Sequence, residues 1–570
     1  MIAQRDVLIG LDSGTSVVKA VAFDLEGARE TVARRIGVLP QMVTFVSGGT
    51  EANNLAVKGT PVERLVVSAI EHPSVIEAAR ARGLPVELIP VDGSGMEQEF
   101  GRTWDDAALV LCEMAAKLEA RGLRVAGIAI TGQGDGTWLI DRDGEPVGRA
   151  MLWHDGRSGP IVAELHRNGT AKAVQRFTGT MLNMSNQSGQ LLWLKRHRPE
   201  ALARAATAFH CKDWLYFRMT GERATDVSEG TFTFGDYRTR EYAPEVLELF
   251  CLKDEARLLP PMVDGTRQHA MLTPEAAAAT GLPAGTPVVL APVDLLCGAL
   301  GSGLYDPEGR AGFTVIGSTG AHMRLVFGAD RVILGEEVGY TMPFVAPGSY
   351  VSMVSNMAAT LNIDWLCGVV EEVAEAAGAT LPKRSDLIRL LDAKAAQARP
   401  GRLLYHPFIA EAGERGPFVD SAARASVIGL SGTAGAGDLL RAIYESLGFA
   451  SRDCYESVGG TPAEIRLAGG AARSATCRGI LAAATNAPVR LVKREEVGAA
   501  GAAMVAALSL GILPDINEAC RRWVTPLLAE AEAPDPDLVA AYDRLFPQYR
   551  TSYRALRPVW HALEDLRTRG

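Results

Sequence analysis

Residues 7–24 read VLIGLDSGTSVVKAVAFD, and this stretch decides the fold. The apolar runs at 7–11 and 17–23 predict two strands, and the polar residues between them predict a tight turn. Such a hairpin offers backbone N–H groups and hydroxyls to a phosphate, and the Asp12 carboxylate could hold a water of a magnesium ion. An ordinary hairpin would explain the same residues, so a function for the turn needs support from the rest of the chain.

The chain that follows alternates between helix and strand. Apolar spacing predicts a helix over 104–120, and the run at 125–130 predicts a buried strand. The loop TGQGDG at 131–136 comes directly after this strand, at the edge where open α/β sheets bind their ligands. Asp135 in this loop could therefore accept hydrogen bonds from a substrate rich in hydroxyl groups.

A second strand system begins near the middle of the chain. A buried strand predicted at 286–290 is followed by Asp294 and by a glycine-rich stretch at 298–303, which is typical of a hinge between two halves. A strand at 312–316 then leads into another polar turn, GSTG at 317–320. Two strand-turn-strand systems of this kind indicate an internal duplication.

The last third continues the α/β pattern. We expect a helix over 438–457 and a strand over 465–467 that runs into GGAARS at 469–474. The apolar, Ala- and Gly-rich stretch at 497–513 is slightly short for a membrane span and predicts a buried helix. Its small residues, Gly498 and Gly501 among them, would let the helix approach another backbone closely.

Composition excludes several classes of protein. The chain has 570 residues, of which 47% are apolar, and a net charge of -9. The apolar content argues against a disordered chain, and the acidic balance argues against nucleic acid as a partner. Eight cysteines without a CxxC pair indicate neither a disulfide framework nor a zinc site. With no signal peptide at the N-terminus, we expect a cytoplasmic protein that does not enter a membrane.

Taken together, the ordered motifs resemble the FGGY family of carbohydrate kinases over about residues 1–30 and 96–530. The motifs that carry the resemblance lie at 7–24, 130–136, 151–158, 212–230, 290–303, 312–320, 413–431, 438–455, 467–474 and 495–506. The resemblance implies an α/β fold with two actin/hexokinase-like, that is ribonuclease H-like, domains around a nucleotide cleft. The expected domains are an N-terminal substrate domain of residues 1–30 and 95–298 and a C-terminal nucleotide domain of residues 299–570.

The resemblance also implies ATP-dependent phosphorylation of a hydroxyl group, with Mg²⁺ bound near the phosphates. Asp294 matches the general base that takes the hydroxyl proton as the oxygen moves in line toward the γ-phosphate, and Asp12 matches the carboxylate associated with the metal. The residues matching the nucleotide site are Gly14, Thr15, Ser16 and Lys19 in a first phosphate loop, Gly317, Ser318 and Thr319 in a second, and Gly469, Gly470 and Ser474 beneath the adenosine. The residues matching the substrate site are Gln133, Asp135, Trp153, Asp155 and Arg157. For Asp155 and Arg157, a buried ion pair that closes the loop is the structural alternative.

The substrate class follows from finer similarity. The stretches GQGDGTW and YHPFIAEAGERGPF most resemble the erythritol kinase branch of the family, which favours a four-carbon polyol. Xylulose, ribulose and glycerol stay open as alternatives. A sugar-binding protein without catalysis is a further alternative, although the presence of Asp12, Asp294 and both phosphate loops disfavours it. A homodimer is the one macromolecular partner left open.

The family pattern is interrupted between about residues 28 and 94. This segment resembles the cysteine desulfurase branch of the class V aminotransferases, in which the stretch matching 48–54 cradles the phosphate of pyridoxal phosphate. The chain contains no His-Lys pair that could supply the aldimine lysine of that family, so a pyridoxal-phosphate enzyme is disfavoured. We predict instead a foreign α/β segment at 31–94 spliced into the first domain. The host sheet then loses its third strand, unless residues 43–46 or 65–69 fill the vacant edge.

Overall fold

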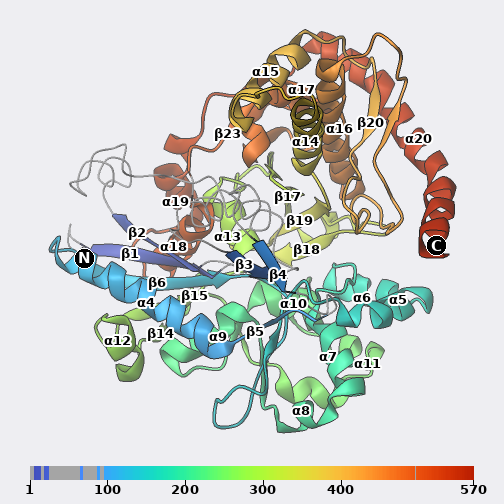
Figure 1. Ribbon diagram of the computed structural model, residues 1–570. Coiled ribbons are helices and arrows are strands. Elements are labelled where there is room, and N and C mark those ends of the chain that lie inside the picture. Colours follow the sequence, from blue (N-terminus) through green and yellow to red (C-terminus); the bar gives the residue numbers. More distant parts are fainter. Residues whose placement is uncertain are drawn as a thin grey trace. The chain divides into compact units, whose positions relative to one another are not determined.

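The computed structural model describes residues 6–13, 18–24, 65–68, 86–89, 95–494 and 496–569 (Figure 1). The chain forms two compact units. Unit 1 consists of Met1–Gly301, Met342–Pro347 and Arg494–Pro526, and unit 2 consists of Ser302–Thr341, Gly348–Lys493 and Leu527–Gly570. By this division residues 494–526 fall in the first unit, whereas we predicted a second domain at 299–570.

Unit 1 is built on a five-stranded sheet with the order β14-β15-β6-β1-β2. The strands are β1 (Asp6–Ser13), β2 (Val18–Asp24), β6 (Arg124–Gly132), β14 (Ala270–Met271) and β15 (Pro287–Leu290). β1 and β2 form the predicted antiparallel hairpin, whereas β1, β6 and β15 run parallel to one another. The carboxyl ends of these three parallel strands therefore meet at one edge of the sheet.

Helices cover both faces of this sheet (Figure 1). On one face lie α4 (Phe100–Glu119), α9 (Cys211–Thr220) and α12 (Pro274–Thr280), and on the other lie α13 (Asp294–Gly301) and α18 (Val497–Ser509). Their apolar side chains bury the inner strands, and Ile9, Ile128 and Val288 are fully buried. The remaining helix of the returning segment is α19 (Ile516–Trp523).

Helix α18 approaches its neighbours through small residues, as predicted. A Cβ atom on Gly501 would lie 1.9 Å from the carbonyl oxygen of Cys297 in α13. A Cβ atom on Gly10 of β1 would lie 2.1 Å from the carbonyl oxygen of Ala499. These approaches leave no space for any side chain, and they are the physical reason why α18 belongs to unit 1.

A second, mainly helical layer of unit 1 has its own core, which includes Leu191, Val246 and Leu258. Its helices are α5 (Gly159–Arg167), α6 (Thr170–Thr178), α7 (Gln187–His197), α8 (Pro199–Arg204), α10 (Val227–Phe234) and α11 (Pro244–Leu249). Short strand pairs connect this layer: β5 (Glu97–Gln98) with β8 (Ala150–Met151), β7 (Trp138–Ile140) with β9 (Thr207–Phe209), β10 (Thr225–Asp226) with β13 (Met262–Val263), and β11 (Gly235–Asp236) with β12 (Glu241–Tyr242).

The edge of the unit 1 sheet next to β2 bears on the predicted insertion. Strands β3 (Leu65–Ser68) and β4 (Val86–Ile89) pair with each other in parallel and form a separate two-stranded sheet. Among the strands that the structure describes, none pairs with the outer side of β2. Residues 65–68 therefore do not fill the vacant edge, while residues 43–46 lie outside the described part of the chain.

Unit 2 is built on a six-stranded sheet with the order β18-β19-β17-β16-β22-β23. The strands are β16 (Ala311–Ile316), β17 (Gly320–Phe327), β18 (Tyr340–Pro343), β19 (Ser349–Asn356), β22 (Glu464–Ala468) and β23 (Val489–Leu491). As in unit 1, an antiparallel hairpin is continued on one side by two parallel strands. The predicted duplication is thus confirmed in the topology of the two sheets.

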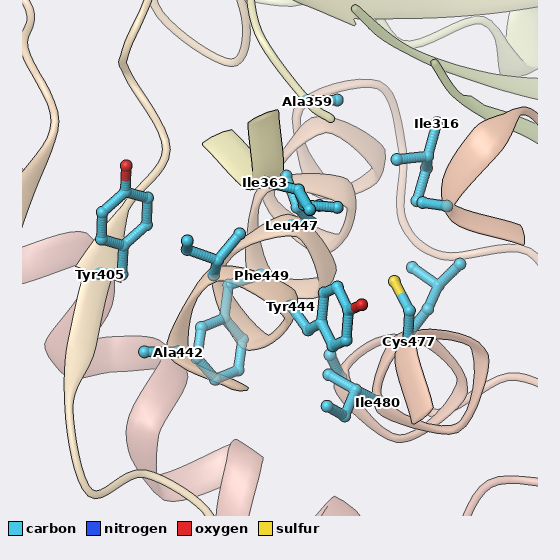
Figure 2. Close-up of a cluster of buried hydrophobic side chains, with 14 of the residues drawn as sticks. Ile316, Ala359, Ile363, Tyr405, Ala442, Tyr444, Leu447, Phe449, Cys477 and Ile480 are labelled. Carbon is cyan, nitrogen blue, oxygen red and sulfur yellow. The ribbon is translucent and has the colours of Figure 1, made fainter. Parts of the chain in front are cut away.

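Long helices pack against this sheet around a large apolar core (Figure 2). They are α14 (Leu361–Ala376), α15 (Arg384–Gln397), α16 (Ala436–Ser457), α17 (Ala475–Thr485) and α20 (Pro536–Arg569), and the short strands β20 (Leu404–His406) and β21 (Ser426–Ile428) pair beside them. Figure 2 shows Tyr444, Leu447 and Phe449 of α16 among side chains from α14 and α17. The helix and strand predicted at 438–457 and 465–467 are confirmed.

Three further expectations, on the hinge, the cysteines and a membrane span, can be compared with the structure. The glycine-rich stretch at 298–303 is not an open hinge, because Gly298 and Gly301 lie within α13, although the boundary between the units falls at its end. All eight cysteines lie in described residues and are free thiols. In the part of the chain that the structure describes, no helix combines the length and the hydropathy needed to span a membrane.

Candidate active site

Three of the predicted carboxylates lie at the carboxyl edge of the unit 1 sheet. Asp12 is the last residue but one of β1, Asp135 follows β6, and Asp294 follows β15. Hydrogen bonds tie the three connections together: the Gln133 N–H donates to the Ser13 carbonyl at 3.0 Å, and the Thr131 hydroxyl donates to the Pro292 carbonyl at 2.6 Å. Strands that are distant in the sequence thus present acidic groups at one edge of a single sheet, the edge at which we expected the Asp135 loop.

Asp294 is the first residue of α13 and is partly buried. Its Oδ1 accepts a hydrogen bond from the Leu295 N–H at 2.7 Å. Burial, reinforced by the negative charge of Asp12, raises the pKa of Asp294 well above its usual range. A carboxylate with a raised pKa binds a proton more tightly, which suits the role of a base toward a hydroxyl group.

Asp12 lies against the N-terminal turn of α18. A Cβ atom on Gly498 would stand 2.4 Å from Oδ2 of Asp12, so only glycine leaves the carboxylate in this position. Asp12 and Asp294 raise each other's cost of ionisation, and a divalent cation coordinated by oxygen atoms would relieve this repulsion. The residues present therefore fit a magnesium ion.

Asp135 is held in an unusual backbone conformation, with φ at 58°. The Asp135 N–H donates a hydrogen bond to the Glu229 carboxylate at 2.9 Å, and the Asn186 amide donates to Asp135 Oδ1, also at 2.9 Å. Burial raises the pKa of Asp135 to about 6, against the opposing effects of the Asn186 hydrogen bond and the charge on His210. Near neutral pH the Asp135 carboxylate is thus a hydrogen-bond acceptor that Asn186 holds in place.

A buried cluster of charges lies behind this loop. The Lys212 ammonium is fully buried and lies 2.7 Å from Asp213, 2.9 Å from Asp226 and 3.3 Å from Glu229. His210 Nδ1 lies 3.1 Å from Asp213 and 3.4 Å from Glu229. Burial opposes the charge on Lys212, but its three acidic neighbours outweigh burial and raise its pKa. The positive charge of the Lys212 ammonium therefore compensates the negative charge of these buried carboxylates.

The predicted substrate residues Asp155 and Arg157 form a closed ion pair. Asp155 is fully buried, and its oxygens accept hydrogen bonds from the Arg157 guanidinium at 2.6 and 2.9 Å and from the Met96 N–H at 2.8 Å. Arg157 also contacts Glu97 at 2.9 Å and lies over the Trp193 ring. This arrangement supports the structural alternative for the pair, and a role in substrate binding stays a prediction.

The other two predicted substrate residues are Gln133 and Trp153. Gln133 is buried, and its amide donates to Gln98 at 3.2 Å, so its side chain connects the 131–136 loop to β5. Trp153 is partly buried, with its ring 4.9 Å from the ring of His154. Neither arrangement tests whether these side chains contact a substrate.

In unit 2, the predicted second phosphate loop is the β16–β17 turn. The carbonyl oxygens of Gly317 and Ser318 accept hydrogen bonds from the Thr360 and Ala359 N–H groups, at 2.8 and 2.7 Å. The turn, which continues to Thr319, is therefore fixed from behind by the segment that precedes α14.

The predicted adenosine loop follows β22 in the same unit. Gly469 has φ at 99°, and a Cβ atom there would collide with the backbone of Ile316. Gly470 begins a short 3₁₀ helix. The Ser474 hydroxyl caps α17 and donates to Asp392, which leaves it a clear structural role. The first phosphate loop at Gly14, Thr15 and Ser16 lies outside the described residues, and only the backbone of Lys19, paired with Asp12, is described.

Sequence reasoning missed several residues that support these groups. Asn186, Lys212, Glu229 and Asp392 were not assigned roles, although Lys212 and Glu229 fall within the quoted motif at 212–230. The motif at 212–230 holds several charged residues, and nothing in its sequence shows which of them is buried, although a buried charged residue needs a partner. Which partner it finds depends on the tertiary fold.

Solved structures of sugar kinases share this fold. The gluconate kinase from Lactobacillus acidophilus superposes with a TM-score of 0.78 at 21% identity, covering 98% of this chain and 99% of that chain. Plasmodium falciparum glycerol kinase with ADP gives a TM-score of 0.74 at 16% identity, covering 97% of this chain and 98% of that chain. The fold is thus that of the two-domain, actin/hexokinase-like carbohydrate kinases, and the predicted fold class is confirmed.

The chain belongs to the FGGY family of carbohydrate kinases. Residues 59–301 match the N-terminal domain of the family, and residues 316–510 match its C-terminal domain. Erythritol kinase from Brucella abortus is 43% identical over 562 residues, which cover 98% of each chain. Xylulose kinase from Bacillus subtilis is 26% identical and covers 83% of this chain and 92% of its own length. The N-terminal match begins within the segment for which we predicted a foreign origin, and that origin stays a prediction.

Proposed function

We propose that the protein transfers the γ-phosphate of ATP to a hydroxyl group of erythritol or a closely similar polyol, with Asp294 as the general base. The observation that carries the proposal is the meeting of Asp12, Asp135 and Asp294 at one edge of the unit 1 sheet. The erythritol kinase relative supports the choice of polyol through its identity over nearly the whole chain.

Each of the three carboxylates has a distinct task in this reaction. Asp135, held by Asn186 and Glu229, accepts hydrogen bonds from polyol hydroxyls and orients the substrate. Asp294 accepts the proton of the attacking hydroxyl, so that the oxygen becomes nucleophilic as it approaches the phosphorus. Asp12 would hold Mg²⁺, which neutralises negative charge on the phosphates when bound.

The nucleotide is assigned to unit 2. Gly317 in the first turn and Gly470 in the second have open space where a Cβ atom would stand, because the nearest atoms lie 3.8 and 3.9 Å away. Backbone N–H groups in such turns bind phosphate oxygens. We assign the phosphates to the first turn and the adenosine to the second.

A coupled assay of ADP release tests the proposal. Purified protein with ATP and Mg²⁺ should turn over erythritol with a higher kcat/KM than glycerol or xylulose. Asp294→Asn should lower kcat by at least about 10³-fold, because a neutral amide cannot take up the proton, while the KM for ATP changes little. Turnover confined to ketopentoses would refute the polyol assignment, and an unchanged kcat in Asp294→Asn would refute the role of the base.

A further inference from the structure

The first turn of α10 contacts both loops that carry the substrate-side carboxylates. Glu229 accepts the Asp135 N–H through Oε1 at 2.9 Å. The hydroxyl of its neighbour Ser228 lies 3.5 Å from the N–H of Val293, the residue before Asp294. One turn of helix therefore touches the connection after β6 and the connection after β15.

We infer that Glu229 is a positioning residue for the polyol, because it fixes the backbone of Asp135 in the orientation that presents its carboxylate to the substrate. The inference rests on the proposed function and names a determinant of substrate recognition within that same site. Glu229 itself lies behind the loop, fully buried, so it acts through Asp135.

The loop at 133–136 needs such support. Asp135 has a positive φ of 58°, a conformation that costs free energy for a residue with a side chain. Gly134 leaves no slack, because a Cβ atom there would stand 2.5 Å from Val293 Cγ2 and 3.0 Å from Glu229 Oε1. The hydrogen bond from the Asp135 N–H to Glu229 offsets the cost of this conformation and selects it over alternatives.

Glu229 is in turn flanked by the Lys212 ammonium and the His210 ring. Lys212 lies 3.3 Å from its Oε2 and His210 lies 3.4 Å away. Lys212 also contacts Asp226, whose carboxylate caps α10 by accepting the Ser228 N–H at 2.6 Å. Glu229 is therefore fixed by its place in the capped helix α10 and by the contact of its carboxylate with the buried Lys212 ammonium.

The chemistry of the contact predicts a specific kinetic signature. Glu229 offers the loop a hydrogen-bond acceptor, and an amide oxygen can offer the same. A side chain of similar length without an acceptor would leave the Asp135 N–H buried and unpaired. The effect should fall on the KM for the polyol, because Asp135 is assigned to the polyol and not to ATP.

The test compares Glu229→Met, Glu229→Gln and the control Glu255→Met. Glu255 is also buried in unit 1 and paired with a lysine, Lys195 at 2.9 Å, but it contacts neither loop. We expect Glu229→Met to raise the KM for erythritol about tenfold or more with the KM for ATP within twofold. Glu229→Gln should recover most of this loss, and Glu255→Met should leave both KM values within twofold of wild type.

A crystal structure of Glu229→Met gives a readout that does not depend on turnover. Asp135 should leave its left-handed conformation in this variant and keep it in Glu255→Met. Unchanged Asp135 geometry, an unchanged KM for the polyol, or an equal rise in the KM for ATP would each overturn the inference. If Glu229→Met does not fold, Glu229→Leu replaces it, because a leucine side chain also offers no hydrogen-bond acceptor to the Asp135 N–H.

The failure of the proposed function would look different. In that case, the wild-type protein would phosphorylate none of the polyols or sugars in the panel, while the comparison of the Asp135 conformation in the variants would still decide whether Glu229 positions the loop.

Discussion

Replacing Asp135 with asparagine should stabilise the fold and weaken the enzyme. Burial raises the pKa of Asp135 from 3.8 to about 6, so the folded protein holds this carboxylate at a cost whenever it is ionised. A shift of about 2 pKa units corresponds to about 3 kcal/mol at 1.36 kcal/mol per unit. Asparagine is uncharged and keeps an oxygen for the Asn186 amide, so it removes this cost without losing that hydrogen bond.

The sign of the pH dependence follows from the raised pKa. Protonated Asp135 stabilises the folded state below pH 3.8, and this contribution is lost as the pH rises through about 6. The advantage of Asp135→Asn in the free energy of unfolding should therefore be smaller at pH 5 and reach about 3 kcal/mol at pH 8. At pH 8, where Asp135 is ionised, the KM for the polyol should rise in the variant, since a charged acceptor is lost.

Urea denaturation of both proteins between pH 5 and pH 8 measures this difference. Asp106→Asn on the exposed face of α4 is the matched control, because it removes a carboxylate from the surface. An Asp135→Asn variant that is less stable than wild type at pH 8, or a difference independent of pH, would refute the reasoning about Asp135.

Two further substitutions test the groups behind the site. Gly498→Ala places a methyl group 2.4 Å from Asp12 Oδ2 and should raise the Mg²⁺ concentration for half-maximal rate about tenfold. The control Gly479→Ala meets no atom within 4 Å and should leave this concentration unchanged. Equal Mg²⁺ requirements in the two variants would contradict the role of Asp12. Lys212→Met leaves three carboxylates without their buried cation and should lower the free energy of unfolding by about 3–5 kcal/mol, measured by urea denaturation beside the exposed control Lys253→Met. A loss no larger than that of the control would show that the buried cluster does not need its ammonium.

Local patterns predicted the frame of the fold. The apolar runs at 7–11 and 125–130 became β1 and β6, and parallel strands that end in polar loops placed Asp12 and Asp135 at one edge. Acidic residues near the carboxyl ends of buried parallel strands lie at the carboxyl edge of the sheet, where the loops after these strands begin. Asp12 and Asp135 could therefore be singled out from the order of strands and loops, whereas Asp294 was assigned through its match to the general base of the family.

Contacts between distant segments were beyond local patterns. Helix α18 is apolar on all sides, so its sequence shows no face that would indicate which unit it joins. We expected it in the second domain, and it packs on the sheet of unit 1. Glycines at 298 and 301 suggested a hinge, whereas they lie in a helix, and Gly301 meets the backbone of Val497. The partners of Lys212 and Glu229 also arise only when α9, α10 and the 131–136 loop are brought together.

The position of α18 has a consequence for how the chain folds during translation. β1 leaves the ribosome before the rest of the sheet, but the helix that covers it begins only at Val497, after most of unit 2 has been synthesised. Until then, the apolar face of β1 and β6 is exposed in the nascent chain and offers a binding surface to chaperones. The first unit to begin folding is therefore unable to finish before most of the second has emerged.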